Sequence, residues 1–333
     1  MSDRRGAADR DLDEDDVRIR PTRNGSRPRS KQRPKHEDAA EGMVLTVDRG
    51  RFSVLIDDAE TVTAMRAREL GRKGIVVGDR VSVVGDMSGS PDALARIVRR
   101  APRDSVLRRT ADDTDPTERI VVANADQLVI VCALADPPPR IGFIDRCLVA
   151  ALTENIEPLL CLTKADLADP STVLQNYEAM SVPTVVTQQA GDLAPLRARL
   201  TGQVSVFVGH SGVGKSTLIN ALVPDANRSI GVVSAIGRGR HTSTSTLAFP
   251  LPEGGWVIDT PGVRSFGLAH VTAADLLWAF PDLEDGTTQC PPGCDHQSGT
   301  AGCQLEAWVA AGNSTPARLA AFRRLLDSRT AAT

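Results

Sequence analysis

The segment from Gly209 to Ser216 reads GHSGVGKS, and it constrains the fold more than any other part of the chain. It matches GxxxxGK(S/T) at every fixed position, follows the apolar run Val204–Val208 and opens a stretch of helical periodicity, Lys215–Leu222. In such a loop the backbone N–H groups and the helix N-terminus surround phosphates, the lysine neutralises the β and γ oxygens, and the hydroxyl reaches magnesium. A glycine-rich turn without a function explains the pattern less well, because a strand and a helix stand on the correct sides. The pattern predicts a P-loop in an α/β domain.

A second motif, Asp259-Thr-Pro-Gly262, ends another apolar run about forty residues after the P-loop. A DxxG segment places its aspartate beside magnesium and its glycine amide near a γ-phosphate. Alone the pattern would be weak, because Pro-Gly is also an ordinary turn. At this distance from a P-loop it indicates a nucleotide switch. The residues that these two motifs assign to nucleotide binding are Gly209, His210, Ser211, Gly212, Val213, Gly214, Lys215, Ser216, Thr217 and Asp259.

A third motif, Thr163-Lys-Ala-Asp166, follows the apolar run Pro158–Leu162 and is similar to the guanine-reading NKxD motif, with Thr in place of Asn. Asp166 would accept hydrogen bonds from N1 and the 2-amino group of guanine, which adenine cannot supply, while the stem of Lys164 covers the ring. A strand end with a capping aspartate would explain the tetrapeptide equally well if it stood alone. After the next apolar run, Thr187 and Gln188 are expected to back the guanine.

The order of these motifs is unusual. The base-reading motif at residue 163 precedes the P-loop at residue 209, whereas Ras-like proteins place it after DxxG. The order predicts a circular permutation, which is tolerable because a site depends on spatial arrangement and domain termini commonly lie close together. It also means that the segment after DxxG continues directly into the C-terminal helices. A nucleotide-sensitive switch would then be connected to a neighbouring domain.

A basic, hydroxyl-rich stretch, Gly237–Thr244, lies between the P-loop and DxxG and is a natural first switch. A threonine here would complete the magnesium shell, and we select Thr242 over Thr244. Val263 stands where Ras-like enzymes carry the glutamine that orients water, so slow turnover without a partner is expected. His241 is the candidate substitute, although a lone loop histidine is more often a solvated side chain. The candidate catalytic residues are Lys215, His241, Thr242 and Gly262, and magnesium is assigned to Ser216 and Thr242.

Three cysteines and one histidine cluster in a Pro/Gly-rich loop with the spacing C-x3-C-x-H-x6-C. Three thiolates and an imidazole fill all four positions of a tetrahedral zinc site and leave none open for water, so a structural zinc site is predicted. The ligands assigned to it are Cys290, Cys294, His296 and Cys303. The other cysteines, Cys132, Cys147 and Cys161, lie in apolar elements and are expected in the core.

Residues 42–102 show short alternating strands separated by turns, which predicts a five-stranded barrel. An OB-type barrel is the leading candidate, since it uses five strands and often binds oligonucleotides; a barrel with only a packing role is the alternative. Residues 1–41 contain few large apolar residues and are predicted to form a disordered charged tail. Its basic part, residues 18–35, could lie along phosphates or merely be solvated. The expected barrel strands are Met43–Val47, Phe52–Ile56, Thr61–Ala67, Arg80–Val84 and Ala95–Arg99.

Between residues 117 and 268, apolar runs alternate with helical stretches, as in a parallel sheet covered by helices. Residues 269–333 are predicted to form a small helical domain around the cysteine cluster. The expected strands are Gln127–Ala133, Pro158–Leu162, Thr184–Thr187, Val204–Val208 and Trp256–Ile258. The expected helices are Ile144–Thr153, Leu193–Leu200, Lys215–Leu222, Ala273–Phe280, Gln304–Ala311 and Pro316–Asp327.

Composition excludes several classes of protein. The 333 residues are 41% hydrophobic, enough for about two or three compact domains. No stretch approaches the roughly 18–20 apolar residues of a membrane span, and the chain opens on charged residues, so neither membrane association nor export is expected. Six cysteines are too few for a disulfide scaffold, and a reducing cytoplasm fits best. A formal net charge of −3 argues against a protein coated in positive potential but leaves local basic patches open.

Together the motifs resemble the RsgA (YjeQ) family of ribosome small-subunit-dependent GTPases over about residues 42–329. The resemblance is carried by Val77-Gly-Asp-Arg-Val81, by Ala123-Asn-Ala-Asp-Gln127, by the permuted order of TKAD, GHSGVGKS, GRHTST and DTPGVRSFGL, and by the cysteine cluster. Three features depart from the family pattern: Thr163 for the usual Asn, Ser243 where a Thr is expected in the switch, and the cysteine spacing.

The resemblance implies a multidomain fold: an all-β OB-type barrel, an α/β circularly permuted P-loop GTPase domain and a small α-helical zinc-binding domain. It implies hydrolysis of GTP to GDP and phosphate with Mg²⁺, stimulated by the 30S ribosomal subunit late in its maturation. We therefore expect a monomeric cytoplasmic protein that binds 16S rRNA and leaves when GTP is cleaved. Two other hypotheses stay open. One is an ATPase or kinase with a P-loop only, against which Asp166 argues; the other is an RNA-binding module whose nucleotide serves as a folding ligand or occupancy sensor, which Val263 permits.

Overall fold

A computed structural model describes residues 36–57, 60–70, 74–90, 93–112, 115–223, 246–261, 266, 268 and 271–329 of the chain. For residues 69, 110–112 and 115–118 it describes the backbone alone. Most of the predicted tail, residues 1–35, lies outside these ranges. The first strand already begins at Ala40, two residues before the predicted start of the barrel. No helix among the described residues is long and apolar enough to cross a membrane.

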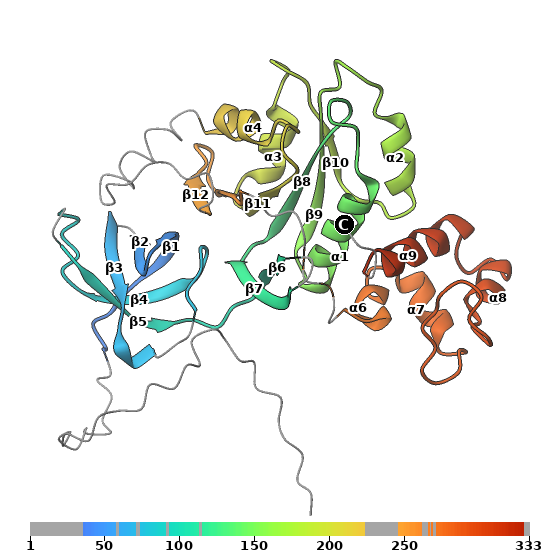
Figure 1. Ribbon diagram of the computed structural model, residues 1–333, viewed down its shortest axis with the longest axis horizontal. Coiled ribbons are helices and arrows are strands. Elements are labelled where there is room, and N and C mark those ends of the chain that lie inside the picture. The colour runs from blue at the N-terminus through green and yellow to red at the C-terminus, as the bar shows by residue number, and fades with distance from the viewer. Residues whose placement is uncertain are drawn as a thin grey trace, which may run out of the picture. The chain divides into compact units, whose positions relative to one another are not determined.

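The N-terminal strands close into a five-stranded barrel, as predicted (Figure 1). Neighbouring strands run in the order β1-β2-β3-β5-β4, and β4 pairs back onto β1. Only β3 and β5 pair in parallel; the other barrel pairs are antiparallel. Alternate side chains of these strands, such as Val54, Val62 and Ile97, fill one apolar core. The barrel elements are β1 (Ala40–Asp48), β2 (Arg51–Ile56), β3 (Thr61–Arg66), the 3-10 turn η1 (Arg68–Leu70), β4 (Arg80–Gly85) and β5 (Ala95–Arg100).

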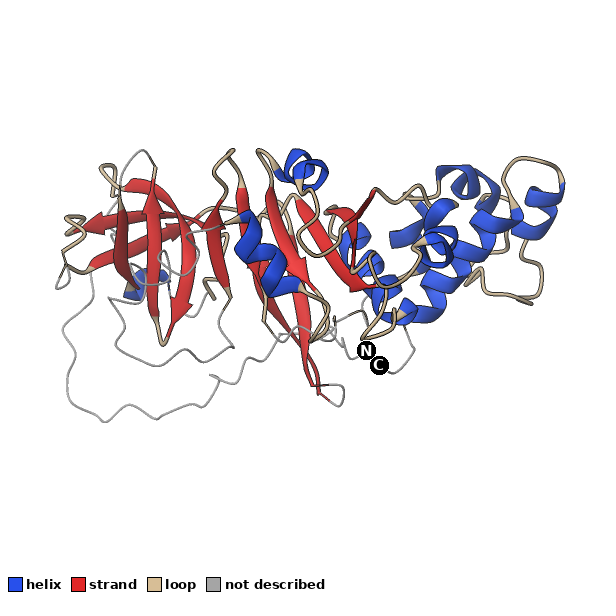
Figure 2. Ribbon diagram, turned by 90° about the horizontal axis from the view of Figure 1, so that it is seen from above, coloured by secondary structure: helices blue, strands red, loops and turns tan. Residues whose placement is uncertain are grey.

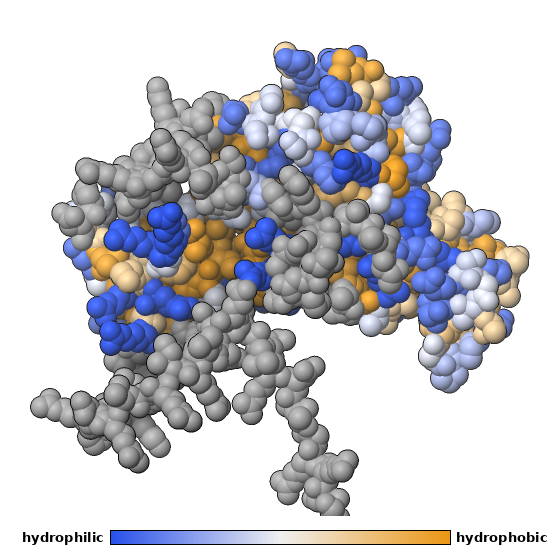
Figure 3. Space-filling model, viewed as in Figure 1, coloured by the Kyte–Doolittle hydropathy of each residue, from blue (hydrophilic) through white to orange (hydrophobic). Residues whose placement is uncertain are grey.

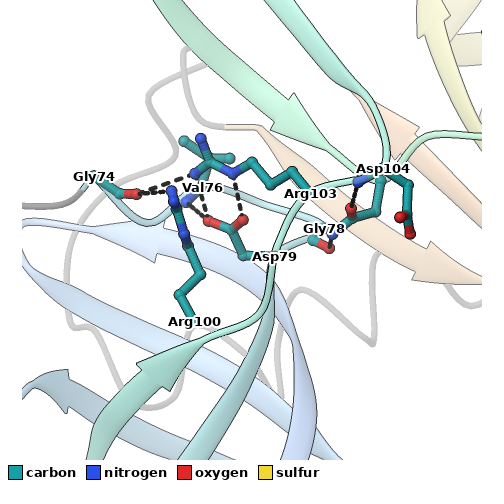
Figure 4. Close-up of polar contacts among 8 residues, drawn as sticks. Gly74, Val76, Gly78, Asp79, Arg100, Arg103 and Asp104 are labelled. Carbon is teal, nitrogen blue, oxygen red and sulfur yellow. Dashed lines mark hydrogen bonds and ion pairs between the residues drawn. The ribbon is translucent and has the colours of Figure 1, made fainter. Parts of the chain in front are cut away.

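A buried ion pair lies where the barrel strands give way to the rest of the chain (Figure 4). Asp79 is fully buried and accepts hydrogen bonds from Arg103 Nε at 2.7 Å and Nη2 at 2.8 Å and from the Val76 amide at 2.8 Å. The preceding Gly78 has φ +87°, and a Cβ there would lie 2.0 Å from the Ala123 carbonyl oxygen. Glycine is therefore required at residue 78 by the close approach of the Ala123 backbone. Asp79 is required because it pairs with the Arg103 guanidinium.

The central sheet continues the order β10-β9-β8-β11-β13-β12. Its five predicted strands are present and pair in parallel, while β12 is an antiparallel addition that also pairs with barrel strand β1 at Thr46 and Leu247. Neighbouring strands whose carboxyl ends meet at one sheet edge form the usual ligand site of such folds. The strands are β8 (Gln127–Ala133), β9 (Glu157–Thr163), β10 (Thr184–Val186), β11 (Val204–Val208), β12 (Leu247–Pro250) and β13 (Trp256–Asp259).

Helices cover both faces of this sheet (Figures 1 and 2). On β8, Leu128 and Ile130 face the core that contains α1 and α2, whereas Val129 and Val131 face the core that contains α3 and α4. The alternation explains why the strand is apolar at every position, as expected for a parallel strand buried on two sides. The helices are α1 (Ile141–Thr153), α2 (Ser171–Glu178), α3 (Ala194–Leu200) and α4 (Lys215–Leu222).

The C-terminal residues form α6 (Ala273–Leu277), α7 (Pro281–Thr287), α8 (Leu305–Ala310) and α9 (Pro316–Ser328). These helices share a hydrophobic core with the sheet domain. Phe322 and Leu325 of α9 belong to the same apolar cluster as α1 and one face of the sheet. The predicted helix Ala273–Phe280 ends earlier, and a new helix starts at Pro281, because proline suits the first turn of a helix but disfavours the helical conformation in the residue before it. A further hairpin, which was not predicted, consists of β6 (Val106–Asp112) and β7 (Asp115–Ala123).

Candidate functional site

The P-loop occupies the turn between β11 and α4. Gly212 and Gly214 have φ +83° and +90°, a backbone conformation that favours glycine, and Gly214 is the N-cap of α4. Gly209 is required for another reason, since a Cβ there would lie 2.7 Å from the Val131 carbonyl oxygen of the neighbouring strand. The fixed glycines of the motif therefore follow from local geometry, and they leave the amides of this turn at the helix N-terminus, where anions bind.

Two charged side chains meet beside this turn. Lys215, the first residue of α4, forms an ion pair with Asp259 at the end of β13, and both side chains are largely buried. The next residue, Thr260, is fixed in turn, because its Oγ1 donates to the Phe207 carbonyl of β11 at 2.8 Å. The predicted DxxG segment thus starts at the P-loop, as the spacing indicated.

The TKAD motif lies at the same edge of the sheet, at the carboxyl end of β9. The buried Thr163 hydroxyl donates to the carbonyl oxygen of Val213 in the P-loop at 2.6 Å. Lys164 has φ +60°, and its ammonium group donates to the carbonyl of Asp136 in the loop after β8. The chain therefore joins its TKAD motif to the P-loop by a direct hydrogen bond.

The expected guanine-backing loop lies beside the TKAD motif. The Ala165 amide donates to the Thr187 carbonyl at 3.2 Å, and the Thr187 amide donates to Leu162 at 2.7 Å. Asp166 and Gln188 are exposed to solvent beside these bonds. The Thr187 side chain, which was also expected to back the guanine, is buried and donates to the Leu162 carbonyl at 3.2 Å.

The P-loop residues differ in their exposure to solvent. Ser211, Gly212, Ser216 and Thr217 are exposed to solvent, whereas the Val213 side chain is buried. The predicted residues His241, Thr242 and Gly262, as well as Thr244 and Val263, lie outside the described ranges.

Sequence reasoning did not identify Phe143, a buried residue of α1 whose ring centroid lies 4.2 Å from that of His210 in the P-loop. It also did not identify Asp136, which follows β8 and accepts the bond from Lys164. A signal for Asp136 existed, because loops at the carboxyl ends of parallel strands line the ligand site. None existed for Phe143, which reads as one more apolar residue of an amphipathic helix.

The four predicted zinc ligands come together in the loop between α7 and α8. One donor atom from each of Cys290, Cys294, His296 and Cys303 lies within 4.8 Å of all the others. The Cys303 sulfur is 3.9 Å from His296 Nδ1, and the Gln304 amide donates to the Cys290 sulfur at 3.3 Å. Burial lowers the pKa of His296, which favours the neutral imidazole that binds metals. Three soft sulfurs and one imidazole in this arrangement fit a closed tetrahedral zinc site.

The fold and the site define a class: a P-loop GTPase with circularly permuted motifs, preceded by a closed five-stranded barrel. A family model described as RsgA GTPase matches residues 100–269. A protein of Chromohalobacter salexigens named small ribosomal subunit biogenesis GTPase RsgA is 39% identical over 269 residues, which cover 78% of this chain and 76% of that protein. A Pseudomonas aeruginosa protein of the same name is 39% identical over 264 residues, 76% of each chain.

Solved structures agree with this assignment. YjeQ from Thermotoga maritima superposes with a TM-score of 0.64 at 25% identity over 87% of this chain and 98% of its own. YloQ, described as a circularly permuted GTPase, shares the fold with a TM-score of 0.63 at 22% identity, over 89% of this chain and 96% of its own. The chain belongs to the RsgA GTPase family and is a GTP-hydrolysing enzyme.

Proposed function

We propose that this GTPase acts in late maturation of the 30S ribosomal subunit, binds 16S rRNA, and is released when GTP is hydrolysed. The names of the relatives in Chromohalobacter salexigens and Pseudomonas aeruginosa support the ribosomal part. The observation that carries the nucleotide site is the hydrogen bond from Thr163 to Val213, because it holds the TKAD motif beside the P-loop, close enough for both to contact one nucleotide. We also propose that the protein acts as a monomer in the cytoplasm.

The proposed site binds GTP with Mg²⁺. The P-loop amides and Lys215 would hold the phosphates, while Ser216 and Thr242 would ligate magnesium and Asp259 would lie beside it. The Gly262 amide would stabilise charge on the γ-phosphate, and His241 would orient the attacking water. Asp166 and Lys164 would select guanine. The ion pair between Lys215 and Asp259 supports these roles, because it shows that both side chains reach the same point beside the P-loop.

The barrel supports an RNA partner. Cross-strand pairing sets Arg51, Met65 and Arg96 in one exposed row across β2, β3 and β5. On the barrel side of the face drawn in Figure 3, hydrophilic residues flank a hydrophobic area. Guanidinium groups on both sides of an exposed apolar side chain suit a phosphate backbone, so the row is the surface we assign to rRNA.

The zinc site has a structural role in this proposal. Cys290, Cys294, His296 and Cys303 would hold one zinc ion with no open position, so it would fix the loop between α7 and α8 and take no part in hydrolysis. Arg323 of α9 donates to the His296 carbonyl at 3.2 Å, which ties this loop to the longest C-terminal helix.

The test is GTP turnover measured by phosphate release, with and without purified 30S subunits. We expect 30S subunits to raise turnover by at least about tenfold, because a partner can complete the positioning of water that Val263 cannot provide. Purified 50S subunits are the matched control, and Lys215→Ala should abolish the stimulated reaction. Turnover that does not change with 30S subunits would count decisively against the ribosomal role. Binding to 30S subunits with no hydrolysis under any condition would favour the RNA-binding module instead.

A further inference from the structure

Arg146 of α1 joins two segments that are far apart in the sequence. Its Nη2 donates to the carbonyl oxygen of Phe266 at 3.0 Å, and its Nη1 donates to the carbonyl oxygen of Ser328 at 3.0 Å. Phe266 follows the Asp259-Thr-Pro-Gly262 motif by four residues, and Ser328 is the last residue of α9. One guanidinium group therefore connects the end of the DxxG segment to the end of the C-terminal helix.

The contact is well suited to an arginine. The carbonyls in the last turn of a helix lack intrahelical donors and carry partial negative charge, which a cation at this position stabilises. The planar guanidinium delivers two donors in a fixed geometry, which a lysine ammonium cannot do. Phe266 is 1% exposed, so its carbonyl lies where a lost donor would not be replaced easily by water.

Both ends of the DxxG segment are consequently anchored, and they are anchored to different parts of the molecule. Thr260 is bound to Phe207 of the P-loop strand, and Phe266 is bound to Arg146. Phe266 comes six residues after Thr260, so the two anchors hold the chain before and after the glycine of the DxxG motif. One anchor belongs to the nucleotide site and the other to α1 and α9.

We propose that Arg146 is a positioning residue for GTP hydrolysis, which acts by holding the end of the DxxG segment through the Phe266 carbonyl. The inference rests on the proposed role of that segment at the γ-phosphate. It deepens that role by naming the regulation: the position of the segment depends on α9, so a partner that displaces the C-terminal helices would change the rate of hydrolysis.

Neighbouring residues of α1 complete the connection. Phe143 packs its ring against His210 of the P-loop, and Asp145 accepts a hydrogen bond from Arg324 of α9 at 3.0 Å. Arg329, just after α9, also donates to the Val271 carbonyl at 2.6 Å. A single turn of α1 thus contacts the P-loop, the end of the DxxG segment and α9.

The test compares Arg146→Lys with Arg197→Lys. Arg197 is a matched control, since it also donates to two helix-end carbonyls, Leu222 at 3.1 Å and Ala221 at 2.7 Å, but it does not contact the DxxG segment. For Arg146→Lys we expect kcat for GTP to fall about tenfold while the Kd for fluorescent GDP stays within about twofold, because GDP lacks the γ-phosphate on which the proposed role of the segment depends. Hydrogen exchange in the peptide that contains Phe266 should become faster. Arg197→Lys should change neither quantity by more than about twofold.

Two outcomes would overturn the proposal: an unchanged kcat for Arg146→Lys, or equal losses of kcat and GDP affinity, which would indicate a general structural defect. If Arg146→Lys proves too unstable to assay, Arg329→Lys weakens the neighbouring contact between the end of α9 and the Val271 carbonyl, five residues after Phe266. This variant should also lower kcat without changing the Kd for GDP, and an unchanged kcat would overturn the proposal. Asp259→Asn separates this result from the proposed function. If that variant keeps wild-type turnover, the proposed role of the DxxG segment in hydrolysis is wrong, whatever Arg146 does.

Discussion

Thr163 stands where the guanine-reading motif usually carries asparagine, and its short side chain still reaches the P-loop. The hydroxyl donates to the Val213 carbonyl at 2.6 Å and lies 3.5 Å from the Cys132 carbonyl. Threonine is β-branched and has few χ1 rotamers, so its side-chain conformation is restricted and the hydroxyl stays directed toward these carbonyls. Thr163 therefore links the TKAD motif to the P-loop directly.

We expect Thr163→Val to weaken binding of both GTP and GDP by about tenfold, because a buried carbonyl left without its donor costs about 1–3 kcal/mol. Thr163→Ser keeps the hydroxyl and is the control, with affinity expected within about threefold of the wild type. Equilibrium titration with fluorescent GDP measures both variants. A valine variant that binds as tightly as the serine variant would show that the bond does not support the P-loop.

Helix α7 is stabilised by a tertiary contact, and its own sequence only weakly indicates a helix. The helix reads PDLEDGT and buries only Leu283 and Gly286. Trp308 of α8 lies over Gly286, and its Nε1 donates to the Asp282 carbonyl at 2.8 Å. A Cβ on Gly286 would lie 2.6 Å from Cγ of this ring. Glycine is needed here for space, although it weakens the helix itself.

Gly286→Ala is therefore expected to lower the free energy of unfolding by about 1–3 kcal/mol, because overpacking outweighs the roughly 1 kcal/mol that alanine contributes to helix propensity. Gly142→Ala is the matched control. It also lies in a helix, but a Cβ there meets nothing within 4 Å, so stability should stay equal or rise slightly. Denaturant unfolding followed by tryptophan fluorescence compares the two variants, and equal effects would refute the steric explanation.

For the molecule as a whole, the six cysteines divide into two groups with different chemistry. Cys132, Cys147 and Cys161 are buried in the cores, and burial raises the pKa of Cys161 to about 12. Such a thiol is protonated and unreactive near neutral pH. The other three cysteines, with His296, form the proposed zinc site.

Thiol titration at pH 8 should consequently find no rapidly reacting cysteine in the zinc-loaded protein, three after zinc removal and six in denaturant. One zinc ion per chain should be released by the chelator. We also expect the melting temperature to fall on zinc removal, since Cys290 and Cys303 pack against the core shared with α9. Rapid modification of three thiols in the native, zinc-loaded protein, without loss of metal, would contradict the assignment.

Several elements show where prediction from the sequence fails. Helix α2 buries only Val173 and Tyr177, so its apolar periodicity is too sparse to indicate a helix. Strand β12 has four residues and ends in proline, and it is a strand because β13 and β1 provide partners on both sides. In both cases the local sequence is compatible with other conformations, and packing against distant residues decides between them.

The amino-acid sequence by itself determined the barrel strands, the parallel sheet, the P-loop and the zinc-ligand cluster, because each depends on residue types at short, regular spacings. Only the tertiary structure decided that Thr163 meets Val213 and that Arg146 joins Phe266 to Ser328. Those contacts depend on which strands and helices become neighbours when the sheet forms. No spacing within the sequence encodes that choice, since it follows from the burial of apolar faces contributed by segments that are far apart in the sequence.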